Sequence, residues 1–545
     1  MDNRIFQEAI ALQTLQKRHQ IVFEKSRLAY YAGCRLNILI VADSFLYFND
    51  ENFGFSELIE TLKSIGTTKY PVTVNLAHRN NPGPDRLNGA TPNYVFEYDQ
   101  LKRYHQVWIM AAQTRSSPPI TDSERLAIKR FMDEGGGIFA TGDHADLGVS
   151  VGGYIPRVRS MRHWFWPSPG PNGEPVAPDG TSAARHDTNR EGHDPGFAFN
   201  DQSDDVPQNI TPRYFGGIIQ SVHPLLCSST GPITVLPDHP HEGECVVPRD
   251  LDASYTIGEE TFVEYPDGPS GRPLSPVVVA TSTMIPGAEV PGRKPPVPGG
   301  TFGAIAAWDG HIAGKYGRVV VDATWHHFTN INLIGDRGLG MPNPSVPKSM
   351  GFLHSAAGLA HYDKIKNYFT NIANWLTPRS MRRCWRFRSI WWLVNQGELR
   401  ENLQLDNPIA TGKLGFEVLK LLGPCERYLF LEDLFIEREI PLPGLINPFA
   451  ERSDEISEVV KALGEEEAKL LADDIAAAFM GAAIVEFIEL DMSVERLRKE
   501  FGDEEAEIPM FTEAAQRAVE KGFSIINERL EKQENLRSVV LKAMR

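Results

Sequence analysis

Apolar and polar positions along the first quarter of the chain form blocks that predict strands and helices in turn. Continuous apolar runs are typical of strands that a parallel sheet buries on both faces. Apolar residues at helical spacing predict the helices that connect such strands. The order of the blocks predicts a β-α-β-β-α-β unit and therefore a doubly wound, mostly parallel sheet. The expected strands are 37–43, 72–76, 104–110 and 138–141, and the expected helices are 55–64 and 121–134.

The stretch 133–148 is the focus of this pattern. Thr121 and Glu124 form a capping box that starts a helix, and glycines at 135–137 can end it. A short apolar strand follows, and at Gly142 the chain is expected to turn sharply. Ligand sites of open parallel sheets lie at the carboxyl ends of the strands. Three polar residues follow this turn: Asp143, His144 and Asp146.

The rest of the chain divides into further segments. Residues 148–215 are rich in Pro, Gly, Asp and Asn and predict a long loop insertion, for which a functional role is favoured over a solvated acidic loop. Apolar runs at 233–236, 277–280, 302–307 and 317–322 predict later strands, and 356–376 predicts a helix. The expected domains are an N-terminal amphipathic helix at 1–34, an α/β domain at 35–378 that ends at Pro378, and a helical, acidic region at 379–545.

Composition narrows the class of protein. The chain has 545 residues, 41% hydrophobic and 23% charged, as in globular proteins. A net charge of −16 argues against nucleic-acid binding. The five cysteines are scattered without a CxxC pair, which fits a reducing compartment. The first residues lack the apolar core of a signal peptide, and no run of about 18 apolar residues predicts a membrane span. We therefore expect a cytoplasmic protein without a membrane partner.

Imidazole and carboxylate groups recur after the expected strand ends. His326 and His327 follow the strand 317–322, which ends in Asp322. In a doubly wound sheet both strand ends lie at the same edge, so these groups can converge with Asp143 and His144. The alternative is that Asp143 and Asp146 cap the next helix and that His144 bonds to backbone. The long loop adds further candidates for substrate contact: His186, Asp187, His193 and Asp194.

Three segments together resemble the ThuA-like branch of the class I glutamine amidotransferase-like superfamily. The first is the Gly-Gly-Gly strand and turn at 135–144. The second is His223-Pro-Leu with the later acidic residues Glu242 and Glu244. The third is the Gly-Arg-Val strand at 317–322 that leads to His326 and His327. The resemblance covers roughly residues 35–376 and implies a flavodoxin-like sheet, with His223, Glu244 and His327 among the substrate-binding residues.

The chain departs from that superfamily at the residue that matters most. True amidotransferases carry a cysteine at the elbow, and here the elbow residue aligns with Asp143. A carboxylate cannot form a thioester, and no cysteine is near in sequence. No His-x-Glu pair follows His327 to orient an imidazole. Cysteine-dependent hydrolysis of glutamine is therefore not expected, and the resemblance leans toward a carbohydrate-like substrate by analogy alone.

Two mechanisms fit a hydrolase that acts on a small polar substrate. In one, a divalent metal such as zinc or manganese is bound by Asp143, His144, Asp146 and His326 and activates a water. In the other, Asp143 acts with His144 or His326 as an acid/base pair. No nucleotide cofactor is expected. The rival hypothesis is a catalytically degenerate scaffold, whose region 379–545 binds a protein partner or forms a homo-oligomer.

Overall fold

The computed structural model describes residues 35–68, 71–143, 146–164, 208–215, 221–237, 244–284, 300–339, 342–343, 349–382, 408–421, 424–436, 454–489 and 516–534. Two compact units share the chain. One contains residues 36–213 and 222–379 and is called the sheet domain below; the other includes 380–545 and is called the helical unit. The boundary after Arg379 lies one residue beyond the expected boundary at Pro378. The expected N-terminal helix, 1–34, lies outside the described residues.

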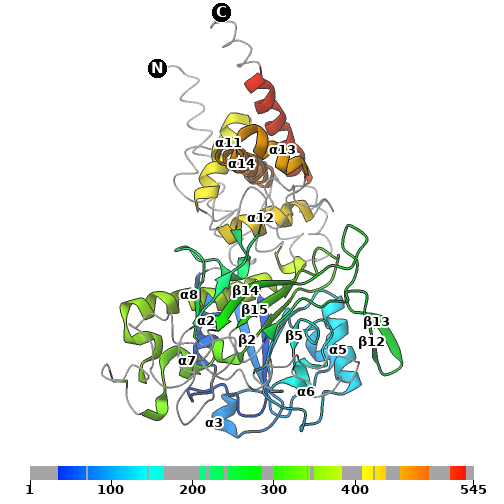
Figure 1. Cartoon of the computed structure of the whole chain (residues 1–545), viewed down its shortest axis with the longest axis vertical. Helices are drawn as coiled ribbons and strands as arrows, with labels where there is room; N and C mark the ends of the chain where they lie inside the picture. Colours follow the sequence, from blue (N-terminus) through cyan, green and yellow to red (C-terminus); the bar gives the residue numbers. More distant parts are fainter. Residues whose placement is uncertain are drawn as a thin grey trace, which may run out of the picture. The chain divides into compact units, whose positions relative to one another are not determined.

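An eight-stranded mixed sheet forms the centre of the sheet domain (Figure 1). Its first five strands run parallel, and its last three pair antiparallel. The expected α/β class is thereby confirmed. The sheet also places the strand ends of β4 and β16 side by side, because Thr141 pairs with Asp322. In spatial order the strands are β2 (Val72–His78), β1 (Leu36–Ala42), β3 (Gln106–Met110), β4 (Gly137–Thr141), β16 (Val319–Asp322), β15 (Gly300–Trp308), β14 (Val277–Met284) and β7 (Thr211–Pro212).

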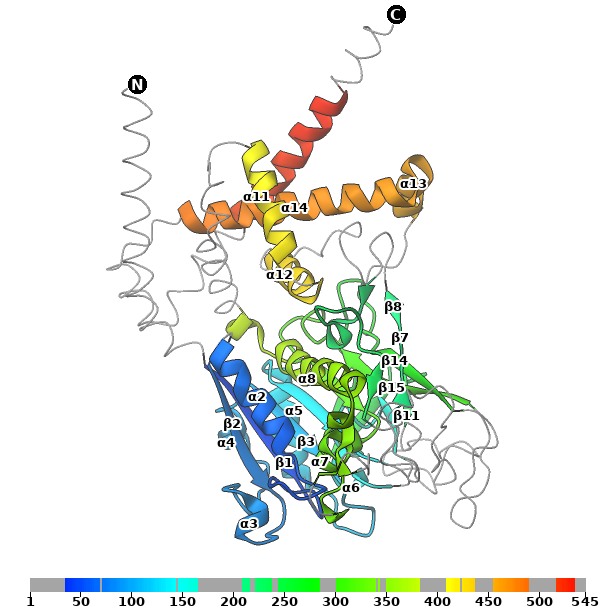
Figure 2. The same ribbon diagram turned by 90° about the vertical axis from the view of Figure 1, so that its left-hand side faces the viewer.

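Helices cover both faces of this sheet. Figure 2 shows α2 (Ser56–Thr68) and α8 (Ala356–Trp375) side by side on one face and α5 (Asp122–Asp133) on the other. Apolar side chains of β1, β3, β4 and β16 pack with those of α5 into one buried cluster. Short helical turns complete the domain: α3 (Pro84–Leu87), α4 (Tyr98–Leu101), α6 (Val149–Gly152), α7 (Asn330–Ile334), η2 (Pro224–Leu226), η4 (Trp325–His327), η5 (Arg337–Leu339) and η7 (Gly351–His354).

The segment from α5 to β4 follows the expected local rules. Thr121 caps α5 in a capping box with Glu124, which confirms the predicted start of this helix. Gly135 then adopts a left-handed conformation with φ of 99°, which only glycine reaches without strain. After β4, a Cβ on Gly142 would lie 2.7 Å from the ring of Trp164. A glycine is therefore required where the chain turns beneath that ring.

The expectation of a loop throughout 148–215 is wrong for the part that is described. Residues 149–164 form α6 and β5 (Arg162–His163), and Val149, Ile155, Val158 and Trp164 are fully buried in the main core. Residues 211–212 form β7 at the edge of the central sheet. The glycines and prolines suggested a loop. The apolar residues between them pack in the core, but their irregular spacing gives no pattern that predicts this. Residues 165–207 lie outside the described part.

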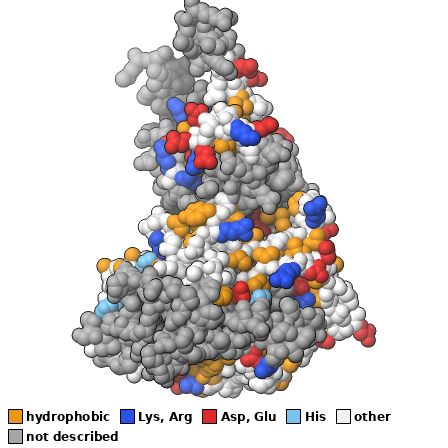
Figure 3. Space-filling view, in the orientation of Figure 1, with side chains coloured by type: hydrophobic (Ala, Val, Ile, Leu, Met, Phe, Trp, Pro, Cys, Tyr) orange, Lys and Arg blue, Asp and Glu red, His pale blue; other side chains and the backbone are white. Residues whose placement is uncertain are grey.

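The helical unit contains α11 (Pro408–Leu421), α12 (Pro424–Ile436), α13 (Asp454–Leu463), α14 (Glu465–Glu489) and a helical stretch at 516–534. Small and aromatic side chains of α14 are buried in its core. The buried carboxylate of Glu486 is neutralised by Arg517 at 2.8 Å and Lys521 at 3.2 Å. In the described ranges, no helix combines the length and the apolar character that a bilayer crossing needs. Acidic and basic side chains are interspersed on the face drawn in Figure 3.

Candidate active site at the carboxyl edge of the sheet

Asp143 and His326 come together at the ends of two adjacent parallel strands. Asp143 follows β4 by two residues, and Thr324 stands at the same level after β16. The Thr324 hydroxyl donates to Asp143 Oδ1 at 2.8 Å, and His326 Nε2 lies 3.4 Å from Asp143 Oδ2. The Asp143 side chain is fully buried and that of His326 is 4% exposed. Two groups 183 positions apart in sequence (326 − 143) therefore form one buried imidazole–carboxylate pair.

The turn after β16 orients His326. The Thr324 hydroxyl accepts from the His326 backbone N–H at 3.1 Å and so caps η4. On the imidazole, Nδ1 lies 3.0 Å from Asn332 Oδ1, which also accepts from the Thr329 hydroxyl at 2.7 Å. An amide oxygen can only accept, so His326 Nδ1 carries a hydrogen. His326 Nε2 and Asp143 Oδ2 would then repel each other unless a proton lies between them. A proton on one of these two atoms would remove that repulsion.

Aromatic side chains and unsatisfied donors surround this pair. The Trp325 ring packs on His326 with centroids 4.1 Å apart, and Phe45 and Phe53 contact Trp325 edge-on at 5.6 and 5.8 Å. Trp325 Nε1 and Asn332 Nδ2 are buried donors that no acceptor satisfies in the described part of the protein. Buried donors are rarely left without an acceptor. Both N–H groups can donate a hydrogen bond to an oxygen atom of a ligand.

Asp43, the last residue of the strand expected at 37–43, is a second buried carboxyl at this edge. Its Oδ1 accepts from the backbone N–H groups of Ala112 and Gln113 at 2.6 and 3.0 Å. Its Oδ2 has no hydrogen-bond partner among the described residues. Burial raises the pKa of Asp43 to about 6, against the lowering effect of the two N–H groups and of Arg79. Asp43 lies between β1 and β3, where neighbouring connections leave the sheet in opposite directions.

His327, one of the expected substrate contacts, lies against a carboxylate of the protein itself. Its side chain is fully buried, and Nδ1 lies 2.7 Å from Asp322 Oδ1. The other oxygen of Asp322 accepts from the Tyr368 hydroxyl at 2.6 Å, and burial together with Asp322 raises the pKa of Tyr368. His326 and His327 are adjacent, yet they face different carboxylates: His327 bonds to Asp322, and His326 lies 3.4 Å from Asp143. Position in sequence alone could not separate their roles.

His223, another expected substrate contact, bonds to the backbone of the chain. Its Nδ1 accepts from the backbone N–H of Leu225 and caps η2, and its ring lies edge-on to Trp375 with centroids 4.5 Å apart. The side chain is buried, which suits a structural cap. Glu244, the other residue of that resemblance, pairs with His163 at 2.9 Å. The sequence offered no sign of His163, because the two-residue strand that carries it gives no periodic pattern.

The remaining candidates are only partly described. Asp146 Oδ2 accepts from the Arg115 backbone N–H at 3.1 Å, and the Arg115 side chain lies 3.4 Å away. Gly148 is the N-cap of α6 without a side-chain hydrogen bond, so neither aspartate caps that helix. Among the residues that the structure describes, no group of three or more His, Cys, Asp or Glu side chains is placed to hold a metal ion. Four candidates lie outside those residues: His144, His186, Asp187 and His193.

A cysteine does lie near this edge, although none was near in sequence. Cys245 is buried, and its Sγ lies 3.5 Å from the carbonyl of Ala304 and 3.4 Å from that of Val321. Burial raises the pKa of the Cys245 thiol well above its ordinary value. A buried neutral thiol is a poor nucleophile. Cys245 therefore packs between β15 and β16 and does not replace the elbow cysteine.

Comparison with known proteins identifies no relative: no family model, no curated protein and no solved structure matches this chain.

Proposed function

We propose that this protein is a hydrolase for a small polar substrate and that Asp143 and His326 form its acid/base pair. The observation that carries the proposal is the 3.4 Å contact between Asp143 Oδ2 and His326 Nε2 at adjacent strand ends. A pair that holds a proton can donate it to a leaving group and take it back from water. Thr324 and Asn332 hold the two side chains in the orientation that such a transfer needs.

The proposal extends to the fold family. We propose a flavodoxin-like domain of the class I glutamine amidotransferase-like superfamily, nearest to the ThuA-like branch. The parallel strand order β2-β1-β3-β4-β16 supports this proposal, as does the position of Asp143 at the elbow after β4. The chemistry must differ from that of an amidotransferase, because Asp143 cannot form a thioester and the Cys245 thiol is buried. A cytoplasmic location remains part of the proposal.

The surroundings of the pair favour a substrate rich in oxygen. Trp325 Nε1 and Asn332 Nδ2 can donate to hydroxyl or carbonyl oxygens, and aromatic rings such as Phe45 and Phe53 can pack against the apolar face of a sugar. A carbohydrate-like substrate therefore agrees with the donors as well as with the analogy to the ThuA-like branch.

A metal-assisted form of the reaction is compatible with the same two atoms. Two ligands at about 2.1 Å from a tetrahedral ion lie roughly 3.4 Å apart. The separation of Asp143 Oδ2 and His326 Nε2 is 3.4 Å. Zinc or manganese held by these two side chains would lower the pKa of a bound water. Asp146 is a weaker candidate ligand, because its carboxylate already bonds to Arg115. Metal analysis of protein purified without chelators separates the two forms.

The test of the proposed function uses a panel of p-nitrophenyl esters and p-nitrophenyl glycosides. We expect the wild-type protein to hydrolyse at least one of them, and Asp143→Asn and His326→Gln each to lose about 100-fold or more of kcat. Asp50→Asn is the carboxylate control, because the exposed Asp50 has no place in the proposed site. His105→Gln is the imidazole control, since His105 Nδ1 bonds to the Asn37 N–H at the opposite edge of the sheet. Equal activity of all five proteins would refute the proposal.

Near-complete burial of the pair favours a second candidate function, a scaffold without catalysis. A substrate can reach Asp143 only if the surrounding segments move, because its side chain is fully buried. In the scaffold, the helical unit would bind a partner or form a homo-oligomer. Truncation after Pro378 would then abolish assembly in sedimentation experiments, and Asp143→Asn would change neither assembly nor biological activity.

A further inference from the structure

Arg162 joins the ends of the two strands that carry the candidate active site. It lies on β5, which pairs with β11 (Glu244–Cys245) into a two-stranded ribbon. Its Nη2 donates to the main-chain carbonyl oxygens of Asp143 at 2.6 Å and Ala323 at 2.8 Å. Asp143 follows β4 and Ala323 follows β16, so one guanidinium holds both strand ends.

Ion pairing does not explain a buried guanidinium at this place. Arg162 packs on the Trp164 ring, and its hydrogen bonds within the described residues all go to main-chain carbonyl oxygens, the third being that of His163 at 3.2 Å. A buried charge without a charged partner costs free energy, and an apolar side chain of similar volume would avoid that cost. What arginine alone supplies is a set of donors in one rigid plane. Its chemistry therefore fits the task of holding several carbonyl groups at once.

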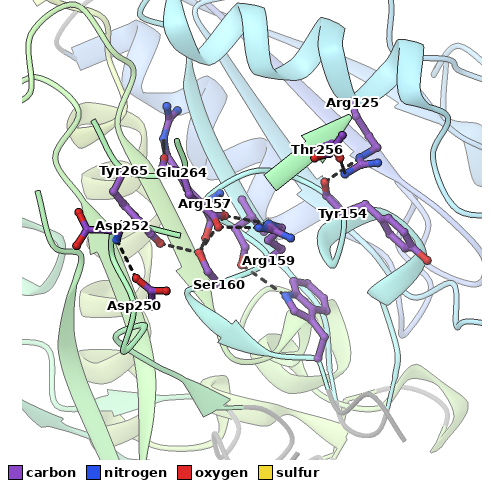
Figure 4. A network of polar contacts seen from close by, with 12 residues as sticks. Arg125, Tyr154, Arg157, Arg159, Ser160, Asp250, Asp252, Thr256, Glu264 and Tyr265 are labelled. Carbon is purple, nitrogen blue, oxygen red and sulfur yellow. Dashed lines mark hydrogen bonds and ion pairs between the residues drawn. The ribbon is translucent and has the colours of Figure 1, made fainter. Parts of the chain in front are cut away.

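The segment that leads into Arg162 is held by a buried network, shown in Figure 4. Arg159 donates to both oxygens of Glu264, at 3.0 and 2.8 Å. The same carboxylate accepts from the Arg157 backbone N–H at 2.7 Å and from the Ser160 hydroxyl at 3.1 Å. Arg159 and Glu264 are almost fully buried. A side chain on a segment held in this way is pre-positioned.

The two carbonyl groups that Arg162 holds belong to residues that set the geometry of the buried pair. Asp143 carries the carboxylate itself, and the Thr324 hydroxyl fixes its side chain at Oδ1. Ala323 directly precedes Thr324, which caps the turn that orients His326. A rotation of either peptide group would move Asp143 Oδ2 relative to His326 Nε2. A displacement of about 1 Å at a reacting centre can cost about 100-fold in rate.

We propose that Arg162 is a positioning residue of the proposed hydrolase and acts through the peptide groups of Asp143 and Ala323. The inference rests on the proposed function and extends it. Arg162 touches no substrate in this role, so its replacement should lower kcat and leave KM unchanged. A loss of kcat without a change in KM is the sign of an interaction that acts in the transition state.

The experiment compares wild-type protein with Arg162→Lys on the most reactive p-nitrophenyl substrate of the panel. Lysine keeps the charge and most of the stem but lacks the planar fork. Arg125→Lys is the matched control: Arg125 is also buried, and it donates to the carbonyl oxygens of Tyr154 and Thr256, each at 3.3 Å, instead of to the two strand ends (Figure 4). We expect Arg162→Lys to lose about 100-fold of kcat with KM unchanged. Arg125→Lys should keep both constants.

A second variant separates positioning from a general loss of structure. Arg162→Ala leaves space for a free guanidinium ion, which can donate to the same two carbonyl groups. We expect guanidinium, at concentrations far below those that unfold the protein, to restore a substantial part of kcat in Arg162→Ala and none in Asp143→Asn. Sodium chloride at equal ionic strength is the control for salt, and circular dichroism checks that each variant is folded.

A further measurement does not depend on catalysis. In protein that contains fluorotryptophan, the fluorine NMR resonance of Trp325 reports on the turn that carries His326, and Trp325→Phe assigns that resonance. We expect Arg162→Lys to shift or broaden it, because the strand end before the turn is no longer held. Arg125→Lys should leave it unchanged.

The outcomes separate this inference from the proposed function. If Asp143→Asn is inactive while Arg162→Lys keeps the wild-type kcat, the positioning role is wrong and the proposed function stands. A loss that appears in KM alone, or that guanidinium cannot restore in folded Arg162→Ala, also overturns the positioning role. If the wild-type protein hydrolyses no member of the panel, the proposed function fails. The fluorine resonance then decides whether Arg162 positions the strand ends, and an unchanged resonance in Arg162→Lys overturns that role.

Discussion

Asp43→Asn gives a quantitative test of how the edge of the sheet is built. Wild-type Asp43 is fully buried, and burial raises its pKa from 3.8 to about 6. The folded protein therefore holds a proton on Asp43 more tightly than the unfolded chain does. At low pH the carboxyl is protonated in both the folded and the unfolded protein, and it then does not lower the free energy of unfolding. Its ionisation destabilises the folded state as the pH rises from about 4 through 6.

The size of the effect follows from the shift itself. One pKa unit corresponds to about 1.36 kcal/mol, and the shift from 3.8 to about 6 is about 2.2 units, so ionisation of Asp43 lowers the free energy of unfolding by about 3 kcal/mol. Asparagine keeps an oxygen that can accept from the Ala112 and Gln113 N–H groups, and it cannot ionise. Relative to wild type, the free energy of unfolding of Asp43→Asn should therefore increase by about 3 kcal/mol as the pH rises from 4 to 7.5.

The assay is urea unfolding followed by tryptophan fluorescence at half-unit steps of pH. The useful quantity is the difference between variant and wild type at each pH, since the other titrating groups cancel in it. Asp50→Asn, at an exposed position on the segment after β1, serves as control. A difference for Asp43→Asn that stays constant within about 0.5 kcal/mol would refute the assignment of a raised pKa. If Asp43→Asn instead lost stability relative to wild type as the pH rises, folding would lower the pKa of Asp43 and not raise it.

Three further substitutions test contacts in the sheet domain, with the free energy of unfolding as the measurement. Glu264→Gln leaves Arg159 buried without a carboxylate and should destabilise by about 3–5 kcal/mol; a loss under about 1 kcal/mol would contradict the buried ion pair. Tyr368→Phe removes the donor to Asp322 Oδ2 and should lose about 1–3 kcal/mol. Gly142→Ala places a methyl group 2.7 Å from Trp164 and should lose about 1–3 kcal/mol; wild-type stability would show that the turn can shift.

Local patterns were sufficient for the parallel core of the sheet. The apolar runs at β1 and β4, the capping box of α5 and the glycine at 135 each act over a few residues, so the sequence displays them directly. The antiparallel half was harder to derive. Strands β14 and β15 were expected, but their direction depends on the segments that connect them. The buried turns at 149–164 lack any regular period, and composition suggested a loop.

The candidate site, too, could be predicted from the sequence only in part. Sequence order could place Asp143 and His326 at the same edge of the sheet, because parallel strands share one carboxyl edge, but the pairing of β4 with β16 came only from the structure. It could not decide which of two adjacent histidines faces Asp143, since that choice is made within the single turn η4. Nor could it find His163, because its partner Glu244 is 81 positions away. Side-chain roles fixed by one tertiary contact have no signal in a single sequence.

The two imidazole–carboxylate pairs differ in their exposure to solvent. The side chains of the Asp143–His326 pair are almost completely shielded from water. The side chains of His163 and Glu244 are 24% and 18% exposed. Arg162 bonds to the backbone of both strand ends and stands next to His163 in sequence. The ribbon of β5 and β11 therefore helps to fix the two strand ends that carry the buried pair.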